Sequence, residues 1–186
     1  MATIVYAMLM SLDGYVTGPK QEFGLPIPQA ELHRHFNQLM RQTSVALYGR
    51  RMYEVMRYWD SPEREQDADE VEVDFAHAWR ETPKLVFSTT LREVGPNARL
   101  VSSDAMAVVR SLKSESDGEI SVAGPTLAAE LARSGLIDEY RLYQHPVVLG
   151  GGKPYFQLGL SLQLKSLGSE KLPQGVTLLR YAPVGP

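Results

Sequence analysis

Two strand-like runs in this chain pass straight into a glycine and then into a helix-like period, and this feature constrains the fold more than any other. The run from Val45 to Tyr48 leads into Gly49, and the run from Ile120 to Ala123 leads into Gly124. Strands that alternate with helices in this way are typical of an α/β domain, in which helices pack on the faces of a largely parallel sheet. The pattern therefore predicts the α/β class.

The rest of the chain supports a single α/β domain over residues 1–186. A nearly continuous apolar run over 4–10 predicts a strand buried on both faces. Apolar residues at helical spacing predict helices over 28–43, 69–80, 105–112 and 127–133. In the final third only loops separate the strand-like stretches 140–148, 161–169 and 176–182. We therefore predict a mixed sheet with parallel βα units first and antiparallel strands last.

Composition excludes several functions. The 186 residues contain no Cys, which excludes disulfides, thiolate nucleophiles and zinc–thiolate sites. No apolar stretch is long enough to cross a membrane, and the chain opens directly on a strand-like run without a targeting segment. A net charge of −3 argues against a broad nucleic-acid-binding surface. We expect a cytoplasmic protein that binds neither nucleic acid nor a membrane.

The charge is unevenly distributed along the sequence. Residues 60–74 hold eight acidic residues and one Arg, a local net charge of −7, so the remainder carries +4. We interpret the acidic stretch as a solvated helix face and expect no metal site. The positive remainder leaves room for a site that binds an anion.

The two strand–Gly–helix turns are candidate phosphate sites. A glycine at a strand end lets a ligand approach the backbone, and the helix that follows offers free N–H groups. Arg50 and Arg51 follow Gly49 and add bidentate donors suited to a phosphate. The alternative is a tight turn with exposed arginines, which we favour for either turn alone. Two such turns on parallel strands favour a dinucleotide, which bridges that distance.

Other segments carry weaker signals. Ser88 and Thr89, at a predicted strand end, have hydroxyls that could bind a phosphate or a ribose, or could simply be polar. The glycine-rich run 150–154 fits neither the Walker nor the Rossmann pattern, so we interpret it as a sharp turn lining a ligand cleft. His145, in an apolar stretch, is interpreted as structural.

Asp13 follows the first predicted strand within the segment 11–15, SLDGY. Loops at strand ends often carry function in α/β proteins. The alternative for Asp13 is an ordinary Asp-Gly turn.

Together these segments resemble a known family. The motifs occur in the expected order over almost the whole chain: MSLDGYV (10–16), LYGRRMYE (47–54), KLVFSTTL (84–91), and ISVAGPTL (120–127) continuing through GLIDE (135–139) to PVVLGGG (146–152). They resemble the dihydrofolate-reductase-like family that includes the C-terminal reductase domain of the riboflavin-biosynthesis deaminase/reductase. The resemblance implies a three-layer α/β/α fold, NADPH as cofactor, a small-molecule substrate and often a homodimer.

The resemblance also gives roles to individual residues. The residues that would bind the cofactor are Gly14, Gly49, Arg50, Arg51, Ser88, Thr89, Gly124, Pro125, Thr126 and Leu127. Ser88 and Thr89 would bind the adenosine-side phosphate, and the segment 124–127 would cradle the pyrophosphate. Ser11 and Asp13 are the catalytic candidates beside the nicotinamide, with Asp13 anchoring substrate or delivering a proton.

Two departures from the family pattern leave alternatives open. Met52 stands where a Thr hydroxyl is common near phosphate, and Ala123 replaces the first of two usual glycines. The leading hypothesis is an NADPH-dependent reductase of a riboflavin-pathway ribosylaminopyrimidine or of a pterin or folate. The alternative is a non-catalytic nucleotide-binding or assembly protein that kept the fold. A third, an NADH-dependent reductase, is disfavoured by Arg50 and Arg51.

Overall fold

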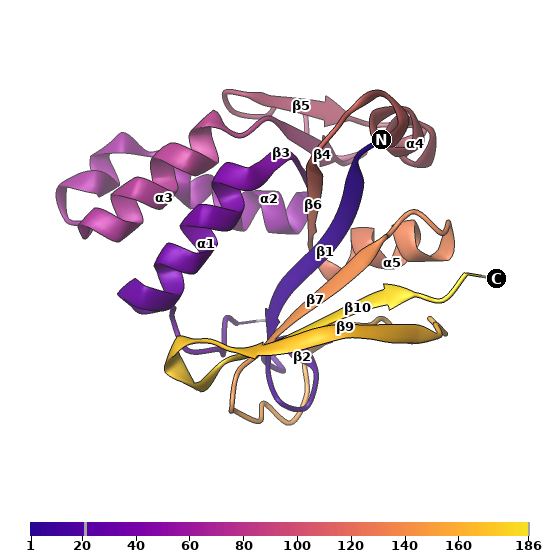
Figure 1. Ribbon diagram of the computed structural model, residues 1–186. Helices are drawn as coiled ribbons and strands as arrows, with labels where there is room; N and C mark the ends of the chain where they lie inside the picture. Colours follow the sequence, from indigo (N-terminus) through magenta and orange to yellow (C-terminus); the bar gives the residue numbers. More distant parts are fainter. Residues whose placement is uncertain (21, 186) are drawn as a thin grey trace.

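An eight-stranded mixed sheet forms the middle layer of the protein (Figure 1). We describe it from a computed structural model that covers residues 1–20 and 22–185. The strand order is β5-β4-β3-β6-β1-β7-β10-β9. The strands are β1 (Thr3–Met10), β3 (Thr43–Gly49), β4 (Lys84–Phe87), β5 (Ala98–Val101), β6 (Glu119–Ala123), β7 (Glu139–Gln144), β9 (Leu164–Lys171) and β10 (Thr177–Pro183). A separate pair is formed by β2 (Tyr15–Thr17) and β8 (Lys153–Pro154).

The sheet is parallel from β5 to β7 and antiparallel at its other end, as the sequence predicts. Strand β10 pairs antiparallel with both β7 and β9. The two strands that pair with β1, namely β6 and β7, are both parallel to it. The mixed sheet is therefore confirmed, and β9 lies at its antiparallel edge.

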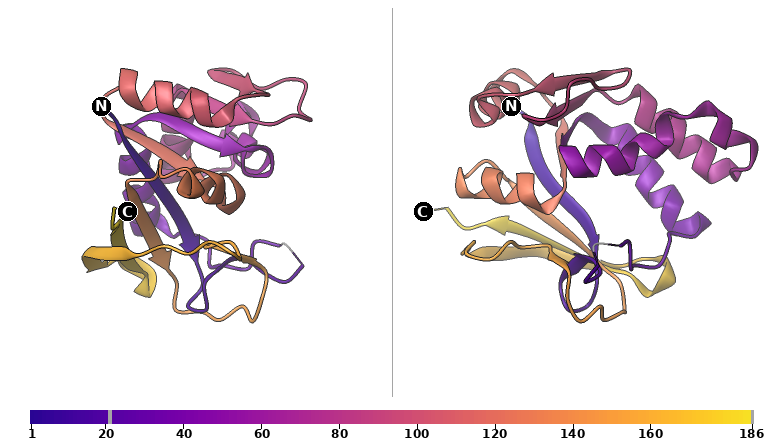
Figure 2. Two further views of the ribbon diagram at one scale, coloured as in Figure 1. Left: turned by 90° about the vertical axis from the view of Figure 1, so that its right-hand side faces the viewer. Right: turned by 180° about the vertical axis from the view of Figure 1, so that it is seen from behind.

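Helices cover both faces of the sheet, which gives the expected three-layer α/β/α arrangement (Figures 1 and 2). They are α1 (Ala30–Gln42), α2 (Arg50–Met56), α3 (Glu70–Glu81), α4 (Ala105–Glu115) and α5 (Pro125–Arg133), with short 3-10 helices at Arg57–Asp60, Pro62–Gln66 and Pro173–Gly175. Helices α1, α2 and α3 share one face, and α4 and α5 share the other.

Alternating residues of each strand supply the two halves of the core. In β3, Ala46 and Tyr48 pack with Trp79 of α3, whereas Leu47 packs with Val109 of α4 and Leu127 of α5. Successive side chains of a strand point to opposite faces, so an apolar run is needed when both faces are covered. This explains why polar and apolar residues do not alternate along the central strands.

Local signals fix several helix ends. Asp69 and Glu72 form a capping box at the start of α3, in which each side chain accepts a hydrogen bond from the backbone of the other. Gly135 follows α5 with φ of +65°, and the N–H of Leu136 bonds back to the carbonyl of Leu131. Gly135 therefore ends α5 as a C-cap glycine does.

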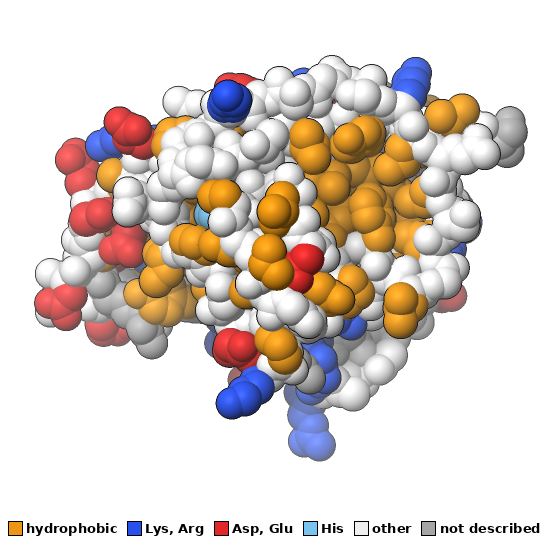
Figure 3. All heavy atoms as spheres, turned by 90° about the horizontal axis from the view of Figure 1, so that it is seen from below, with side chains coloured by type: hydrophobic (Ala, Val, Ile, Leu, Met, Phe, Trp, Pro, Cys, Tyr) orange, Lys and Arg blue, Asp and Glu red, His pale blue; other side chains and the backbone are white. Residues whose placement is uncertain are grey.

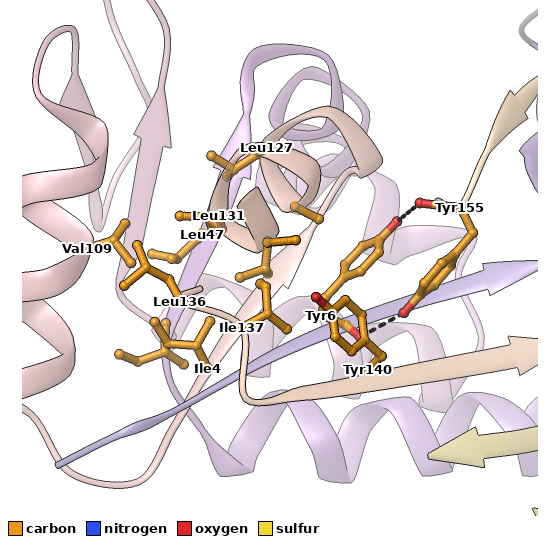
Figure 4. Close-up of a cluster of buried hydrophobic side chains, with 14 of the residues drawn as sticks. Ile4, Tyr6, Leu47, Val109, Leu127, Leu131, Leu136, Ile137, Tyr140 and Tyr155 are labelled. Atoms are coloured by element: carbon orange, nitrogen blue, oxygen red, sulfur yellow. Dashed lines mark hydrogen bonds between the residues drawn. The ribbon is translucent and has the colours of Figure 1, made fainter. Parts of the chain in front are cut away.

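A pair of tyrosines joins β1 to the segment after β8 (Figure 4). The Tyr6 hydroxyl donates to the carbonyl of Tyr155 at 3.2 Å, and the Tyr155 hydroxyl donates to the carbonyl of Tyr6 at 3.0 Å. Both side chains are fully buried, and their ring centroids lie 4.3 Å apart. Burial raises the pKa of both tyrosines, so both hydroxyls remain protonated donors. This pair holds the loop after β8 against the sheet.

Candidate active site

The two strand–Gly–helix turns lie side by side. Strands β3 and β6 are neighbours, and Tyr48 stands opposite Ala123 in their register. Gly49 and Gly124 therefore follow at adjacent strand ends, where α2 and α5 begin. Adjacent strands are about 4.8 Å apart, which is closer than the two ends of a dinucleotide. The turns form one cradle at neighbouring strand ends, rather than the two distant anchors expected from the sequence.

Gly124 has a backbone conformation that L-residues rarely adopt, with φ of +103°. A Cβ at this position would lie 3.3 Å from the Cβ of Met52 in α2. Pro125 occupies the first position of α5 and has no N–H, so Thr126 and Leu127 supply the first-turn N–H groups that lack intrahelical acceptors. The glycine thus allows the two helix starts to pack against each other.

Arg50 and Arg51 begin α2, and both side chains are exposed. Strand β4 lies beside β3 with Phe87 opposite Gly49, so Ser88 and Thr89 continue the same edge of the sheet. The Ser88 Oγ accepts hydrogen bonds from the N–H groups of Thr90 and Leu91 at 3.1 and 3.0 Å, which fixes the turn. Thr89 is exposed.

Strand β1 projects past its neighbour β6. Tyr6 is the last residue of β1 paired with β6, whereas pairing with β7 continues to Met10. Four further residues span about 13 Å at 3.3 Å each. The carboxyl end of β1 therefore extends beyond that of β6 and forms a step beside Gly124. Ser11 and Asp13 follow the last residue of β1. The structure therefore brings all the candidate residues to one edge of the sheet, where the parallel strands have their carboxyl ends.

The Asp13 carboxylate connects two loops. It accepts hydrogen bonds from the Ser11 hydroxyl at 2.6 Å and from the N–H groups of Leu149 and Gly150 at 3.1 and 2.8 Å. The hydrogen bond from the Ser11 hydroxyl lowers the pKa of Asp13 most, and the hydrogen bonds from these N–H groups lower it further. Asp13 is exposed and Ser11 is fully buried. An ionised carboxylate that binds a neighbouring loop is suited to positioning, and less suited to donating its own proton.

The glycine-rich turn after β7 packs closely on the loop after β1. Strand β8 pairs with β2, and the N–H of Tyr155 donates to the carbonyl of Gly14. A Cβ at Gly152 would come within 1.9 Å of the carbonyl oxygen of Thr17, so only glycine fits there. This contact explains Gly152, and positive φ angles of +74° and +159° explain Gly150 and Gly151.

His145 follows β7 and is fully buried. Its backbone N–H donates to the carbonyl of Met10 at 2.8 Å, and neither ring nitrogen has a partner among the residues that the structure describes. Burial lowers the pKa of His145, so the ring is neutral at pH 7. The structure places it inside the protein, but its ring nitrogens are not satisfied as the interpretation of a structural histidine expects.

A cavity of about 360 Å³ opens between α5 and the segment that begins at β8. Thr126 and Arg133 of α5 line one side, and Lys153 and Gln157 line the other. Lys153 belongs to the glycine-rich turn that we expected to border a ligand cleft. The contribution of Arg133 was not apparent from the sequence, although it lies seven residues after Thr126 and so on the same helix face.

The loops around this edge expose apolar side chains. Leu12, Phe23, Ile27 and Val148 are all more than half exposed. Figure 3 shows the molecule from below, where many apolar side chains are exposed and the surface is hollowed at the upper right. Sequence analysis missed these four exposed side chains because they come from separate segments.

The strand order and the helices on both faces of the sheet give the protein a dihydrofolate-reductase-like fold. Residues 2–178 match the model of the RibD C-terminal domain, and the chain belongs to this family. The expected resemblance and fold are therefore confirmed. Within the described residues, no helix is long and apolar enough to cross a membrane.

Known proteins similar to this chain include one relative of undetermined role. It is the uncharacterized protein YyaP of Bacillus subtilis strain 168, which is 27% identical over 180 residues, covering 96% of this chain and 93% of the relative. A putative riboflavin biosynthesis protein from Shewanella sp. PV-4 superimposes with a TM-score of 0.74 at 24% identity, over the full length of both chains.

Two further structures are similar in fold. RibD from Acinetobacter baumannii gives a TM-score of 0.67 at 15% identity, covering all of this chain and 59% of the larger protein. Dihydrofolate reductase from Enterococcus faecalis, complexed with NADP(H) and RAB-propyl, gives 0.67 at 10% identity, covering 98% and 97%.

Proposed function

We propose that this protein is an NADPH-dependent reductase of a small heterocyclic or sugar-linked substrate, of riboflavin-pathway or pterin and folate type. The observation that carries the proposal is the cradle formed by Gly49 and Gly124 next to the projecting end of β1. The family and the NADP(H)-bound neighbour of the same fold support this choice of cofactor.

The residues at the cradle fit a dinucleotide phosphate. The N–H groups of Thr126 and Leu127 at the start of α5 suit a pyrophosphate, since a helix N-terminus carries partial positive charge. Arg50, together with Ser88 and Thr89 on the next strand, would bind the phosphate on the adenosine side, and Arg51 would lie nearer the pyrophosphate. When bound, the cofactor supplies the hydride.

The step beside β1 would hold the nicotinamide and the substrate. Ser11 and Asp13 fix the loop at this step, and Asp13 also holds the turn at Gly150. Our proposal is that Asp13 anchors the substrate or orders the water that delivers the proton, because its lowered pKa keeps the carboxylate ionised. Proximity and orientation supply most of the catalysis expected of such a site.

The cavity between α5 and β8 supports binding of a small molecule next to the cradle. Arg133 and Lys153 give it two cations and Glu130 gives it one carboxylate. A polar substrate with an anionic group suits this lining.

A non-catalytic nucleotide-binding protein is the second candidate. Met52 lies against Gly124 and offers no hydroxyl to a phosphate, which favours a weaker or altered cofactor site. The cytoplasmic location and the homodimer implied by the resemblance are further parts of the proposal.

The experiment combines binding with turnover. NADPH is titrated against the protein, and its oxidation is followed by absorbance with dihydrofolate and with the riboflavin-pathway ribosyl intermediate. Binding with oxidation supports the reductase, and binding without oxidation of either substrate favours the second candidate. Absence of NADPH binding would overturn both.

A further inference from the structure

His33 lies one turn into α1, close to the edge of the sheet that carries the cradle. Its backbone N–H donates to the carbonyl of Gln29, the residue before α1, at 2.8 Å. The N–H of Gln29 donates to the side-chain oxygen of Gln174 at 2.6 Å. The next residue, Gly175, packs on Pro146, because a Cβ there would lie 3.3 Å from the Pro146 Cγ. Pro146 follows β7, so the start of α1 is held where the parallel strands have their carboxyl ends.

Aromatic rings fix the plane of the His33 imidazole. Its centroid lies 5.8 Å from that of Trp59 and 5.3 Å from that of Phe75, and both rings meet it edge to face. Trp59, in the short helix after α2, and Phe75, in α3, belong to the core cluster that also contains Tyr48, the residue before Gly49. The side chain of His33 therefore lies on the face of the sheet from which α2 starts.

A chain of hydrogen bonds decides which ring nitrogen of His33 carries a proton. The amide nitrogen of Asn37 donates to the carbonyl of Val71 at 2.9 Å and to the carboxylate of Asp74 at 2.7 Å. The hydrogen bond from Asn37, followed by the one from Arg41, lowers the pKa of Asp74, so this carboxylate is ionised and only accepts. Both amide hydrogens of Asn37 are thus in use. Its Oδ1, 2.9 Å from the Nδ1 of His33, has to be an acceptor.

The Nδ1 of His33 is therefore a donor, and in a neutral imidazole this leaves Nε2 as an acceptor. Among the described residues, none bonds to this Nε2, and it is not sealed from solvent as the two ring nitrogens of His145 are. The ring is 9% exposed. The described part of the chain contains no group of three residues that could hold a metal ion. The protein thus presents one oriented lone pair, suited to a hydrogen-bond donor, near the ligand edge.

The chemistry of Nε2 selects the part of the ligand that it can bind. Phosphate and carboxylate oxygens are themselves acceptors, so the phosphates of a dinucleotide do not suit it. An N–H of an amide or amino group on a heterocycle does. A site built to bond such a group discriminates against analogues that lack it, because its own polar atom would be left unpaired.

We propose that His33 is a specificity-determining residue whose Nε2 accepts a hydrogen bond from an N–H group on the heterocyclic ring of the substrate. This role rests on the proposed reductase function and deepens it, because it names the group of the substrate that the α1 side of the site binds. Asn37 is a positioning residue, which acts through the His33 ring.

The kinetic experiment follows NADPH oxidation with dihydrofolate and with the riboflavin-pathway ribosyl intermediate. H33A should raise the KM for the substrate about tenfold and leave kcat and NADPH affinity nearly unchanged, since a hydrogen bond outside the reacting atoms is lost. H33Q keeps an amide oxygen near the position of Nε2 and should recover part of the loss. H35A is the matched control, because the His35 ring bonds to the Tyr143 hydroxyl on another face of the same helix. Circular dichroism checks that all variants are folded.

Nuclear magnetic resonance of the wild type, labelled with ¹⁵N-histidine, tests the same atom without turnover. At about pH 8 the Nδ1 of His33 should be protonated and its Nε2 unprotonated, and H33Q assigns the two signals. Addition of either compound together with NADP⁺, which cannot reduce it, should move the Nε2 signal toward that of a protonated nitrogen. If the wild type does not bind the cofactor, the proposed function fails, and the same titration without NADP⁺ decides the role of His33.

The role of His33 is overturned if H33A turns over the substrate with the KM of the wild type, or if a bound compound leaves the Nε2 signal unchanged. It is also overturned if Nε2 rather than Nδ1 carries the proton, or if neither compound binds.

Discussion

The Asp13 carboxylate accepts a hydrogen bond from the backbone N–H of Gly150 at 2.8 Å, and so joins the loop after β1 to the turn after β7. Asp13→Asn keeps the shape, but its amide nitrogen cannot accept a hydrogen bond, so one of the contacts to Leu149 and Gly150 is lost. Under the proposed function we expect turnover to fall on the order of 10²-fold with little change in NADPH affinity. Steady-state kinetics and cofactor titration measure both, with Asp117→Asn, at the exposed N-terminal ion pair, as control. Wild-type turnover would leave Asp13 a structural role only.

Gly124→Val tests the cradle. The φ of +103° disfavours any side chain, and a Cβ would press on Met52 and move the two helix starts apart. We expect a folded variant that no longer binds NADPH measurably by fluorescence titration. Gly135→Val is the matched control, since Gly135 also has a positive φ but lies at the other end of α5 with open space around it. Loss of binding in both variants would point to general strain rather than to the site.

Arg50→Ala tests cofactor choice. NADPH differs from NADH only by the 2′-phosphate, and a charge-assisted hydrogen bond contributes roughly 1.5–3 kcal/mol, less when it is exposed. We expect NADPH affinity to fall by about 10- to 150-fold while NADH affinity hardly changes. Arg51→Ala should weaken both cofactors alike, and Arg110→Ala on the exposed side of α4 should weaken neither. Equal weakening of NADPH and NADH by Arg50→Ala would show that Arg50 does not bind the 2′-phosphate.

Tyr155→Phe removes a buried hydroxyl that donates to the carbonyl of Tyr6. Loss of this buried hydrogen bond should lower the free energy of unfolding by about 0.5–1.5 kcal/mol, measured by urea denaturation. Tyr181→Phe, at a partly exposed tyrosine of β10, serves as the control. A double variant with Tyr6→Phe measures the coupling between the two hydroxyls, and we expect the effects to be non-additive because the rings touch.

Lys84 gives the protein a pH-dependent stability. The side chain is 2% exposed, and its Nζ donates to the carbonyl of Thr82 at 2.6 Å over the Trp79 ring. Burial lowers the pKa of Lys84 to about 8, whereas an unfolded lysine titrates near about 10.4. Between these values the unfolded state binds more protons, so the free energy of unfolding rises with pH.

We expect a gain of about 1–2 kcal/mol between about pH 8 and 9.5, which Lys84→Met should lack. Chemical denaturation across this range measures it. The range ends below pH 10, because burial raises the pKa of Tyr48 to about 12 and stability then falls as unfolded tyrosines ionise. An equal slope in the variant would assign the gain to other groups.

The strand and helix periods predicted the central elements well, because apolar periodicity reports burial directly. The short strands β2 and β8 were not predicted, since three and two residues are too few to establish a period. The sequence also could not predict that Gly49 and Gly124 lie at adjacent strand ends. Strand order depends on long-range packing, and nothing local in either turn indicates that β6 lies next to β3.

The role of Asp13 shows a similar limit. Its position after a buried strand indicated a functional loop, which the structure places at the projecting tip of β1. The contacts to Leu149 and Gly150 join residues more than 130 positions apart, so no local pattern could predict them. Interaction partners that far apart in sequence depend on the completed fold.

The central position of β6 has a consequence for the order in which the chain can fold. β6 separates β3 from β1, yet both precede it in the sequence. During synthesis, β1 has no partner in the main sheet until residues 119–123 have left the ribosome, because both of its neighbours, β6 and β7, come later. The strands β3 to β5 can assemble earlier against α1 to α3, but their inner edge stays open meanwhile. The nascent chain thus carries an unpaired apolar strand for most of its synthesis, a state in which chaperone binding and aggregation compete with folding.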